Sequence, residues 1–399
     1  MNIDKVRLID AVSFALDYLE IGAGRDVTNH NRRVALFAIN VGRALGLSEA
    51  DLSDLYIYAM LHDNGITNKA YYVISEQGRD GMERAYSHCE VGERNIRNFP
   101  FNVNRENIIK YHHEAYDGTG FFGIRGDDIP LLSQIIAIAD YSEILYRKNS
   151  DKREVEAYVL SQRGKKYSDT MVEAFLHAER TLAFWLGMND TFVSRELDEI
   201  VPHSTLSINS EALFKIAAVV GKIIDAKSPF TGSHSQGIAK KIAIMSDFYG
   251  FAPNKKSQIV IAAYLHDVGK LVIPNEILDK PAKLTADEFD IIKAHVYYTK
   301  MMLSAVPGFE DITSWACNHH EKLNGTGYPY GLTEKDLPFE AQLMGCIDVY
   351  QALTENRPYR GSLSHDDTIA ILKNMALNGE VNSRIVNDIS IPGIFADIM

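Results

Sequence analysis

Ten of the thirteen histidines in this chain fall into two series with nearly the same spacing. The first series is His30, His62 with Asp63, His88, His112 with His113, and Asp140; the second is His234, His266 with Asp267, His295, His319 with His320, and Asp348. The step from the first histidine to the His-Asp pair is 32 residues in both series, and the step from the third histidine to the His-His pair is 24 in both. Imidazole and carboxylate groups are common metal ligands, and a spacing that recurs along a chain indicates an internal repeat. The chain is therefore predicted to be a duplication of one metal-ligand set.

Length and hydrophobic periodicity predict an all-α protein of two tandem helical domains. A chain of 399 residues exceeds one ordinary core and fits two domains of about 200 residues each. Apolar residues recur at helical spacing in residues 36–46, 134–146, 211–226, 258–269 and 289–306. The least periodic segment at mid-chain is 201–210, whose Pro, Ser, Thr and Asn are typical of a linker. We expect domains at residues 1–200 and 201–399.

Charge and composition exclude several functions. The net charge of −12 argues against DNA, RNA or membrane-surface binding, which needs basic patches. A small anionic substrate stays compatible with it, because bound metals and a few placed Lys or Arg supply local positive charge. No apolar run approaches the ~18 residues of a membrane span, and the first twenty residues lack the pattern of a signal peptide. We expect a cytoplasmic protein without membrane contact.

The ligand types indicate the chemistry. Imidazoles with carboxylates suit zinc, iron or manganese, and the absence of cysteine from both series argues against a zinc finger. Seven ligands in each series exceed the need of one tetrahedral ion and suit two octahedral ions with open water positions, bridged by the aspartate of the His-Asp pair. Two metals a few Å apart are a common device for phosphoester hydrolysis, since they lower the pKa of a shared water and stabilise an in-line displacement at phosphorus.

The second half of the chain resembles the HD-GYP branch of the HD metallophosphohydrolases. The motifs are HDVGK at 266–270, HHEKLNGTGYP at 319–329 and RPYR at 357–360, and the resemblance extends from about residue 211 onward. It implies a bundle of helices around a dinuclear or trinuclear iron or manganese centre. It also implies hydrolysis of bacterial cyclic dinucleotides, chiefly cyclic di-GMP and in some members 3′,3′-cGAMP.

The resemblance implies roles for individual residues. One metal would be held by His234, His266, Asp267 and Asp348, and the other by Asp267 with His295, His319 and His320. Lys270 would contact the scissile phosphate, and with Asp267 it is the predicted catalytic residue. Gly327, Tyr328 and Pro329 would form the substrate-binding loop that names the family. Arg357 and Arg360 resemble the family's phosphate- and guanine-recognising arginines, whose planar forks suit both tasks.

Three departures from the family pattern stand in this half. Asn324 replaces the usual aspartate, which bears on base specificity, and Gly237 replaces the usual arginine three residues after the first ligand. Members with a third metal have a glutamate four residues before that ligand, where this chain has Phe230. Two metals are therefore expected in the second half.

The first half keeps the ligands and loses most of the surrounding motif. Ile66 stands where the second half has Lys270, Gly-Phe-Phe at 120–122 replaces Gly-Tyr-Pro, and Asn149 aligns with Arg357. Asp26, four residues before His30, lies at the third-metal position. The candidate metal site of this half is Asp26, His30, His62, Asp63, His88, His112, His113 and Asp140. Both a catalytically silent metal cluster and an active site fit this set.

The predicted function is hydrolysis of a cyclic dinucleotide to the linear 5′-phosphorylated dinucleotide by the second half, with the first half supporting or regulating it. Two alternatives stay open: a broader HD nucleotide phosphohydrolase, and a receptor that binds a cyclic dinucleotide without turnover. The sequence leaves open the choice between iron and manganese, the choice between cyclic di-GMP and cGAMP, and any homodimer or signalling partner.

Overall fold

The computed structural model describes residues 3, 5–22, 29–66, 78–97, 99, 101–201, 209–227, 233–356 and 361–396. The predicted residues Asp26, Phe230, Arg357 and Arg360 lie outside this part of the chain. Within the described residues the secondary structure is helical, and the β pairing consists of two isolated bridges. The all-α prediction is thus confirmed. Among the described helices, none is both long and apolar enough to span a bilayer.

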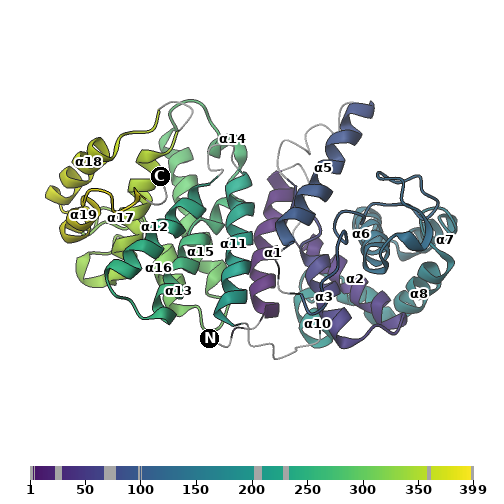
Figure 1. Cartoon of the computed structure of the whole chain (residues 1–399). Helices are drawn as coiled ribbons and strands as arrows, with labels where there is room; N and C mark the ends of the chain where they lie inside the picture. The colour runs from purple at the N-terminus through teal and green to yellow at the C-terminus, as the bar shows by residue number, and fades with distance from the viewer. Residues whose placement is uncertain are drawn as a thin grey trace. The chain divides into compact units, whose positions relative to one another are not determined.

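The chain divides into two compact units (Figure 1). The N-terminal unit is Val12–Thr205, and the C-terminal unit is Leu206–Met399 together with Met1–Ala11. Helix α10 ends at Ile200 and helix α11 begins at Ser210. Most of the predicted linker at 201–210 lies outside the described residues.

The N-terminal unit is built around α2, which packs against α3, α6, α8 and α10. Because neighbours surround α2, its middle turns are apolar on all sides, and Val34, Phe37 and Ile39 are fully buried. The helices described here are α1 (Lys5–Gly22, shared with the other unit), α2 (His30–Ala44), α3 (Glu49–Met60), α5 (Gly78–Ile96), η1 (Gly126–Asp128), α6 (Leu131–Asn149), α7 (Lys152–Ser161), α8 (Asp169–Glu179), α9 (Leu182–Gly187) and α10 (Val193–Ile200).

The C-terminal unit is built around α13, which packs against α11, α12 and α16. Residues 259–265 of α13 are all buried, so an uninterrupted apolar run forms the centre of this bundle. The helices described here are α11 (Ser210–Lys227), α12 (His234–Phe248), α13 (Pro253–Leu265), η2 (Val268–Val272), α14 (Asn275–Leu278), α15 (Ala286–Leu303), α16 (Glu310–Cys317), η3 (Glu334–Asp336), α17 (Phe339–Thr354), α18 (His365–Leu377) and α19 (Ser383–Ile389).

The two units use corresponding helices to carry their ligands. Helices α2 and α12 are each 15 residues long and begin at the first histidine of their series. Helices α3 and α13 end just before the His-Asp pair, α5 and α15 carry the third histidine, and α6 and α17 carry the final aspartate. The sequence repeat is therefore a structural repeat as well.

A glycine after each His-Asp pair allows a close approach of backbone. A Cβ atom at Gly65 would overlap the carbonyl oxygen of His88, and one at Gly269 would overlap that of His295. Only glycine leaves room for the helix of the third histidine at this point. Helix α15 is further fixed by a capping box, in which Thr285 and Glu288 each bond the backbone N–H of the other.

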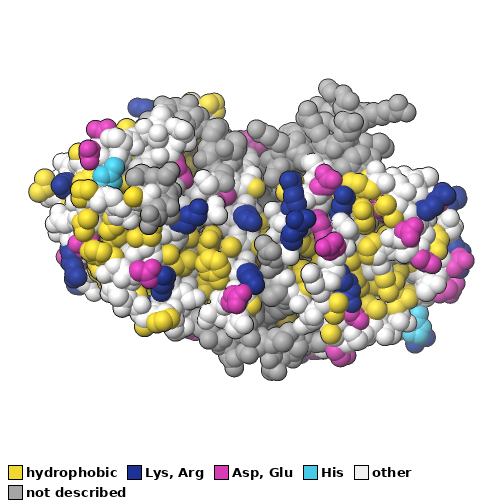
Figure 2. Space-filling model, viewed as in Figure 1, with side chains coloured by type: hydrophobic (Ala, Val, Ile, Leu, Met, Phe, Trp, Pro, Cys, Tyr) yellow, Lys and Arg dark blue, Asp and Glu magenta, His cyan; other side chains and the backbone are white. Residues whose placement is uncertain are grey.

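Charged side chains are interspersed on the face shown in Figure 2. Lys and Arg side chains lie there among Asp, Glu and apolar groups.

Candidate metal centre

In the C-terminal unit, three predicted ligands from different helices form one group of donors. His234 at the start of α12, His266 just after α13 and Asp348 on α17 offer ligand atoms that all lie within 4.8 Å of one another. Nε2 of His234 lies 3.1 Å from Oδ1 of Asp348. We call these residues the first donor group.

A second group of donors lies beside the first. Its members are His295 on α15 and the pair His319 and His320 after α16, and their ligand atoms also lie within 4.8 Å of one another. Asp267 contacts both groups: its Oδ2 lies 3.2 Å from Nε2 of His266, and its Oδ1 lies 3.2 Å from Nε2 of His295. The structure therefore brings all seven predicted ligands together, with Asp267 between the two groups.

Backbone hydrogen bonds orient three of these rings. Nδ1 of His266 donates to the carbonyl of Ala263 at 2.7 Å. His295 and His319 make the same contact with the carbonyls three residues earlier, each at 2.6 Å. Because Nδ1 carries the proton, Nε2 presents a lone pair toward the centre of the site, as a metal-binding imidazole requires.

Several buried polar atoms of the two donor groups make no hydrogen bond. Among the described residues, Nε2 of His266, His295 and His319 and Oδ1 of Asp267 are buried and accept no hydrogen bond. Burying such atoms unsatisfied is costly, and a bound cation would satisfy them. The donor set thus fits the metals that the sequence predicts.

The ionisation states of Asp267 and His320 fit metal binding, whereas a metal would have to displace a proton from His234. Burial opposes protonation of the His234 ring, but hydrogen bonds with Asp348 and Glu355 outweigh it and raise its pKa to about 9. Burial opposes ionisation of Asp267, but the charges of His266 and Lys270 outweigh it and hold the pKa of this carboxyl well below its usual value. Burial lowers the pKa of His320 to about 3, so that the ring is neutral. Metals bind ionised carboxylates and neutral imidazoles.

Lys270 lies at the edge of this centre. It is part of η2, and its Nζ lies 2.5 Å from Oδ2 of Asp267. The chain after it is anchored by Lys227, whose buried Nζ donates to the carbonyls of Leu271 at 2.5 Å and Ile273 at 2.6 Å. Lys227 was not predicted from the sequence, since a lysine at a helix end carries no motif.

The Gly-Tyr-Pro loop lies against the second donor group. The ring of Tyr328 is 4.9 Å from that of His320, and the Tyr328 N–H donates to the His320 carbonyl at 3.2 Å. Glu321 fastens the end of the loop by accepting from the N–H groups of Tyr330 at 2.7 Å and Leu332 at 2.9 Å. Asn324 bonds within the loop, accepting from the Thr326 N–H at 3.1 Å.

Two residues of α15, Phe289 and Lys293, lie beside the Tyr328 ring. Neither was predicted from the sequence. The ring of Phe289 is 6.4 Å from that of Tyr328, and Lys293 places its Nζ 6.0 Å from the Tyr328 ring. Lys293 also lies over the Phe289 ring at 4.6 Å. Their four-residue spacing puts both on one face of the helix, but this spacing is too common to mark a site in a sequence.

The N-terminal unit repeats the donor arrangement. His30, His62 and Asp140 offer ligand atoms within 4.8 Å of one another. Oδ1 of Asp63 lies 3.5 Å from Nε2 of His88. On the other side, its Oδ2 lies 3.6 Å from Nε2 of His62. The structure therefore brings these predicted ligands together in this unit too.

The second donor group of the N-terminal unit contains a residue that the sequence interpretation missed. Cys89, which follows His88 on α5, belongs to a group of ligand atoms with His88, His112 and His113. The thiol escaped prediction because the second series has no cysteine at this position.

The surroundings of the N-terminal site differ from those of the C-terminal site. Ile66 is 4% exposed and occupies the place of Lys270, so the counterpart of the lysine is an apolar core residue. Glu114 holds the following loop as Glu321 does, accepting from the N–H groups of Phe122 at 2.7 Å and Ile124 at 2.9 Å. The loop is kept while its Tyr-Pro sequence is lost.

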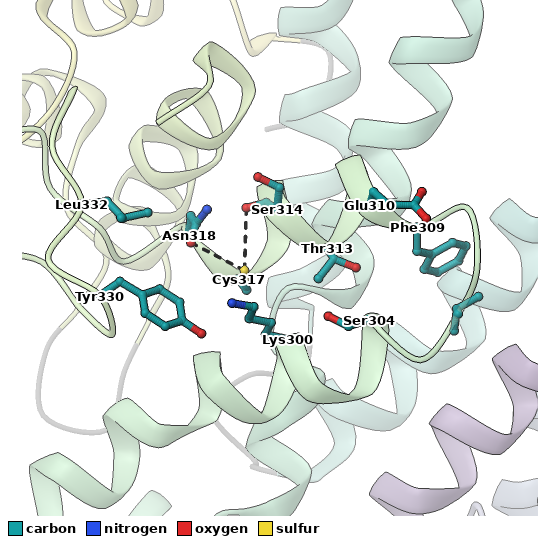
Figure 3. A pocket seen from close by; sticks show the side chains of 11 residues that line it. Lys300, Ser304, Phe309, Glu310, Thr313, Ser314, Cys317, Asn318, Tyr330 and Leu332 are labelled. Carbon is teal, nitrogen blue, oxygen red and sulfur yellow. Dashed lines mark hydrogen bonds between the residues drawn. The ribbon is translucent and has the colours of Figure 1, made fainter. Parts of the chain in front are cut away.

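A separate cavity in the C-terminal unit lies beside α16 (Figure 3). It has a volume of about 460 Å³, and Lys300, Phe309, Thr313, Cys317, Asn318 and Tyr330 are among its lining residues. None of the predicted metal ligands lines it. It is therefore distinct from the donor groups.

Comparison with known proteins identifies the family. The HD domain model matches residues 24–169 and 218–385, well over half of the chain and once in each unit. The protein belongs to the HD domain family. The resemblance noted for the second half is confirmed at this level, and the two matched ranges contain the two histidine series.

Relatives resemble the chain along most of its length. The 3′3′-cGAMP-specific phosphodiesterase 1 of Vibrio cholerae is 27% identical over 398 residues, covering 96% of this chain and 90% of that protein. Phosphodiesterase 3 of the same name and organism is 26% identical and covers 86% of each. A cyclic di-GMP phosphodiesterase of Thermotoga maritima is 30% identical but covers 37% of this chain.

A solved structure shows the same fold. The crystal structure of a cyclic GMP-AMP specific phosphodiesterase of V. cholerae matches with a TM-score of 0.68 and 24% identity, covering 100% of this chain and 98% of that one. The tandem helical architecture is thus shared along the full length.

Proposed function

We propose that the protein is a metal-dependent phosphodiesterase that hydrolyses a cyclic dinucleotide in its C-terminal unit, with 3′,3′-cGAMP as the preferred substrate. The observation that carries the proposal is the position of Asp267, whose two oxygens each lie 3.2 Å from a histidine of a different donor group. A carboxylate placed in this way suits the bridge between two metals.

Two ions, iron or manganese, would occupy the two donor groups. His234, His266, Asp267 and Asp348 would hold one, and Asp267 with His295, His319 and His320 would hold the other. When bound, such metals supply Lewis acidity to the phosphoryl oxygens and lower the pKa of a coordinated water. The nitrogen and oxygen donors of this unit suit both elements.

The residues around the metals would orient and stabilise the reacting phosphodiester. A water oxygen adds to phosphorus, the bond from phosphorus to the 3′ oxygen breaks, and that oxygen leaves with a proton. The product is a linear dinucleotide with a 5′ phosphate. Lys270 would place its ammonium against the phosphoryl oxygens, where negative charge increases in the transition state.

The aromatic surface beside the metals would bind a base. Tyr328, next to His320, offers a ring on which a purine stacks, and Phe289 adds a second ring near it. Lys293, whose Nζ lies near both rings and 2.8 Å from Oδ1 of Asp290, would supply positive charge beside the stacked base. Arg357 and Arg360 stay proposed substrate contacts on the strength of the RPYR motif.

The preference for cGAMP rests on how far each group of relatives matches. Two of the three V. cholerae proteins named cGAMP-specific match 96% and 86% of this chain, including both units, whereas the third matches 34%. Relatives named for cyclic di-GMP match shorter stretches, such as 37% and 45% of the chain. The tandem arrangement therefore favours the mixed dinucleotide over cyclic di-GMP.

We also propose that the N-terminal unit supports or regulates the C-terminal unit. It keeps the donor atoms, but Ile66 replaces the catalytic lysine and its loop lacks Tyr-Pro. Without those groups a cyclic dinucleotide in this unit would lack the contacts that stabilise the transition state.

The test is turnover by the full chain after reconstitution with Fe²⁺ or Mn²⁺. The substrates are 3′,3′-cGAMP, cyclic di-GMP, cyclic di-AMP and a set of mononucleotides, and the products are identified by mass. We expect linear 5′-phosphorylated dinucleotide from cGAMP at the highest kcat/KM, and loss of turnover when a chelator removes the metals. Faster hydrolysis of mononucleotides would indicate the broader phosphohydrolase, and tight binding without product would indicate a receptor; either result overturns the proposal.

A further inference from the structure

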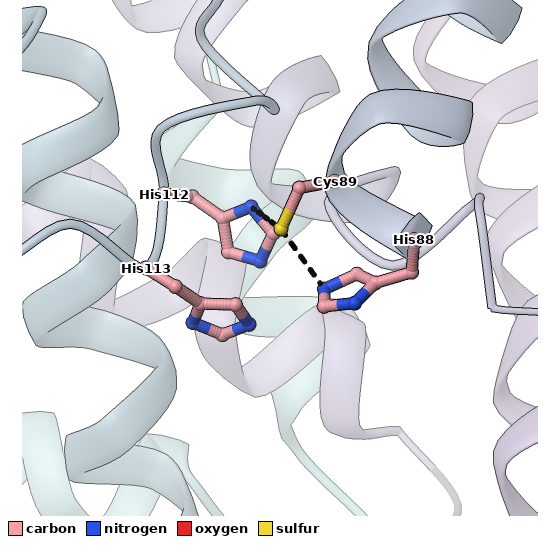
Figure 4. Close-up of side chains that lie close together, drawn as sticks. All are labelled: His88, Cys89, His112 and His113. Atoms are coloured by element: carbon pink, nitrogen blue, oxygen red, sulfur yellow. Dashed lines mark hydrogen bonds between the residues drawn. The ribbon is translucent and has the colours of Figure 1, made fainter. Parts of the chain in front are cut away.

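The second donor group of the N-terminal unit contains a thiol (Figure 4). Sγ of Cys89 lies 3.4 Å from Nε2 of His88 and 4.0 Å from Nδ1 of His112, a ring nitrogen that also lies 2.6 Å from the carbonyl oxygen of Ile109. These residues and His113 offer four ligand atoms that all lie within 4.8 Å of one another. The side chains converge from α5 and from the segment before α6.

The separation of sulfur and nitrogen fits a shared metal ion. With bonds of about 2.3 Å to sulfur and 2.0–2.1 Å to nitrogen, two ligands of a tetrahedral zinc lie about 3.5 Å apart. The 3.4 Å between Cys89 and His88 matches this value. Cys89 is fully buried, and burial together with the nearby Asp63 raises the pKa of its thiol, so that the positive charge of a bound metal would be needed to form the thiolate.

The thiol is specific to this unit. The spacing of the two series aligns Cys89 with Val296 on α15, which is also fully buried. A core position that holds an apolar methyl-bearing side chain in one unit thus holds a metal-binding group in the other. The two units therefore differ in their donor atoms as well as in the motifs around them.

We propose that Cys89, His88, His112 and His113 form a thiolate-ligated zinc site in the N-terminal unit. Thiolate favours zinc and disfavours manganese, whereas the nitrogen and oxygen donors of the C-terminal unit suit iron or manganese. Four protein ligands close the coordination sphere, as in structural zinc sites, and leave no position for a reactive water. The site stabilises the N-terminal unit and does not hydrolyse substrate. This inference is independent of the proposed function of the C-terminal unit.

Cobalt substitution tests the sulfur ligand directly. The full chain with His266→Ala and His319→Ala, which remove one donor from each C-terminal donor group, is loaded with Co²⁺ and its absorption is recorded. A sulfur-to-cobalt charge-transfer band in the near ultraviolet is expected. Cys89→Ser in the same background should lose the band completely.

The other two cysteines provide matched controls. Cys317 and Cys346 are buried thiols that belong to none of the donor groups, so Cys317→Ser and Cys346→Ser should both keep the band. A band that survives Cys89→Ser, or that is absent although one equivalent of cobalt is bound, overturns the proposal. In that case Cys89 donates only a hydrogen bond to His88.

A second measurement requires no substitution at Cys89. X-ray absorption at the zinc edge of the doubly substituted chain, purified from zinc-supplemented cells, should show one sulfur scatterer at about 2.3 Å with nitrogen neighbours. A shell of nitrogen and oxygen alone, or less than about half an equivalent of zinc, contradicts the assignment. Because neither readout uses substrate, failure here leaves the phosphodiesterase proposal untouched.

Discussion

Oε2 of Glu355 lies 2.9 Å from Nδ1 of His234, and this contact orients the first ring of the C-terminal donor groups. The N-terminal unit has an equivalent contact, in which Oε2 of Glu143 lies 2.6 Å from Nδ1 of His30. The two glutamates come from different positions, three residues after Asp140 in one unit and seven after the final aspartate in the other. The units therefore reach the same ring orientation with non-equivalent residues.

The residue three places after the first histidine of each series explains why the two units use glutamates at different positions. In the N-terminal unit this residue is Arg33, whose Nε donates to Glu143 at 2.6 Å. In the C-terminal unit it is Gly237, and the amide of Gln351 fills the space that a side chain there would need. Gln351 accepts from Nζ of Lys241 at 2.6 Å and donates to Glu355. Lysine and glutamine thus replace the arginine that the family pattern leads one to expect at this point.

Removing the carboxylate beside His234 should weaken metal binding. Glu355→Gln leaves a side chain of the same shape but lowers the basicity of the ring, and loss of such an outer partner commonly costs about 10- to 100-fold in metal affinity or activity. The measurement is the dissociation constant for Mn²⁺ at the C-terminal unit. Glu211→Gln, which removes only a surface ion pair with Lys215, should leave it unchanged. Equal affinities for Glu355→Gln and the unsubstituted chain would contradict the assigned role.

The two His-Asp pairs should contribute unequally to turnover. His266→Ala or Asp267→Ala should abolish hydrolysis, because each removes a donor from the proposed catalytic centre. His62→Ala or Asp63→Ala should only reduce it, since the N-terminal unit lacks the lysine and the Gly-Tyr-Pro loop. Initial rates with 3′,3′-cGAMP at saturating metal distinguish the pairs. Complete loss from all four substitutions would place essential chemistry in both units.

Lys270 should affect the rate more than binding. Lys270→Met removes the ammonium 2.5 Å from Asp267, and loss of one group that stabilises transition-state charge typically costs about 10²- to 10³-fold in kcat. The bound metal, measured by elemental analysis, should stay at the level of the unsubstituted chain. Lys256→Met, which removes a surface lysine paired with Asp247, is the control. A change confined to KM would mean that Lys270 binds substrate without stabilising the transition state.

The sequence predicted what the repeat keeps at fixed spacing and little else. The histidines and aspartates of the C-terminal unit lie together because each stands at the same place on corresponding helices. Glu321 could have been predicted from the sequence, because the string HHE occurs in both units. Glu355 could not have been predicted, because its counterpart Glu143 stands at a different spacing from the final aspartate. Which glutamate contacts the first histidine depends on the packing around Gly237. Cys89 was also missed, since nothing in the second series corresponds to it.

Glu321 should be needed for the shape of the Gly-Tyr-Pro loop. Glu321→Ala leaves the N–H groups of Tyr330 and Leu332 without their acceptor, and hydrogen bonds to a charged group contribute about 1.5–3 kcal/mol each. We expect a lower free energy of unfolding and a raised KM for cGAMP. Glu114→Ala, its counterpart in the N-terminal unit, should lower stability without raising KM. Identical KM effects of the two substitutions would show that the loop of the C-terminal unit does not bind substrate.

Lys227 should give the protein a pH-dependent stability at alkaline pH. Burial lowers its pKa to about 7, partly offset by Asp279 and Glu276, whereas in the unfolded chain a lysine titrates near pH 10.4. Between these values the unfolded state binds one proton more than the folded state, so this lysine makes stability rise with pH. Below about pH 7 both states are protonated, and the full cost of burying the charge is present. Urea unfolding from pH 7 to 10 should therefore show a rising contribution that Lys227→Met lacks. Lys256→Met, which removes an exposed lysine, should keep the slope of the unsubstituted chain, and a slope unchanged by Lys227→Met would show that the buried amine stays protonated throughout this range.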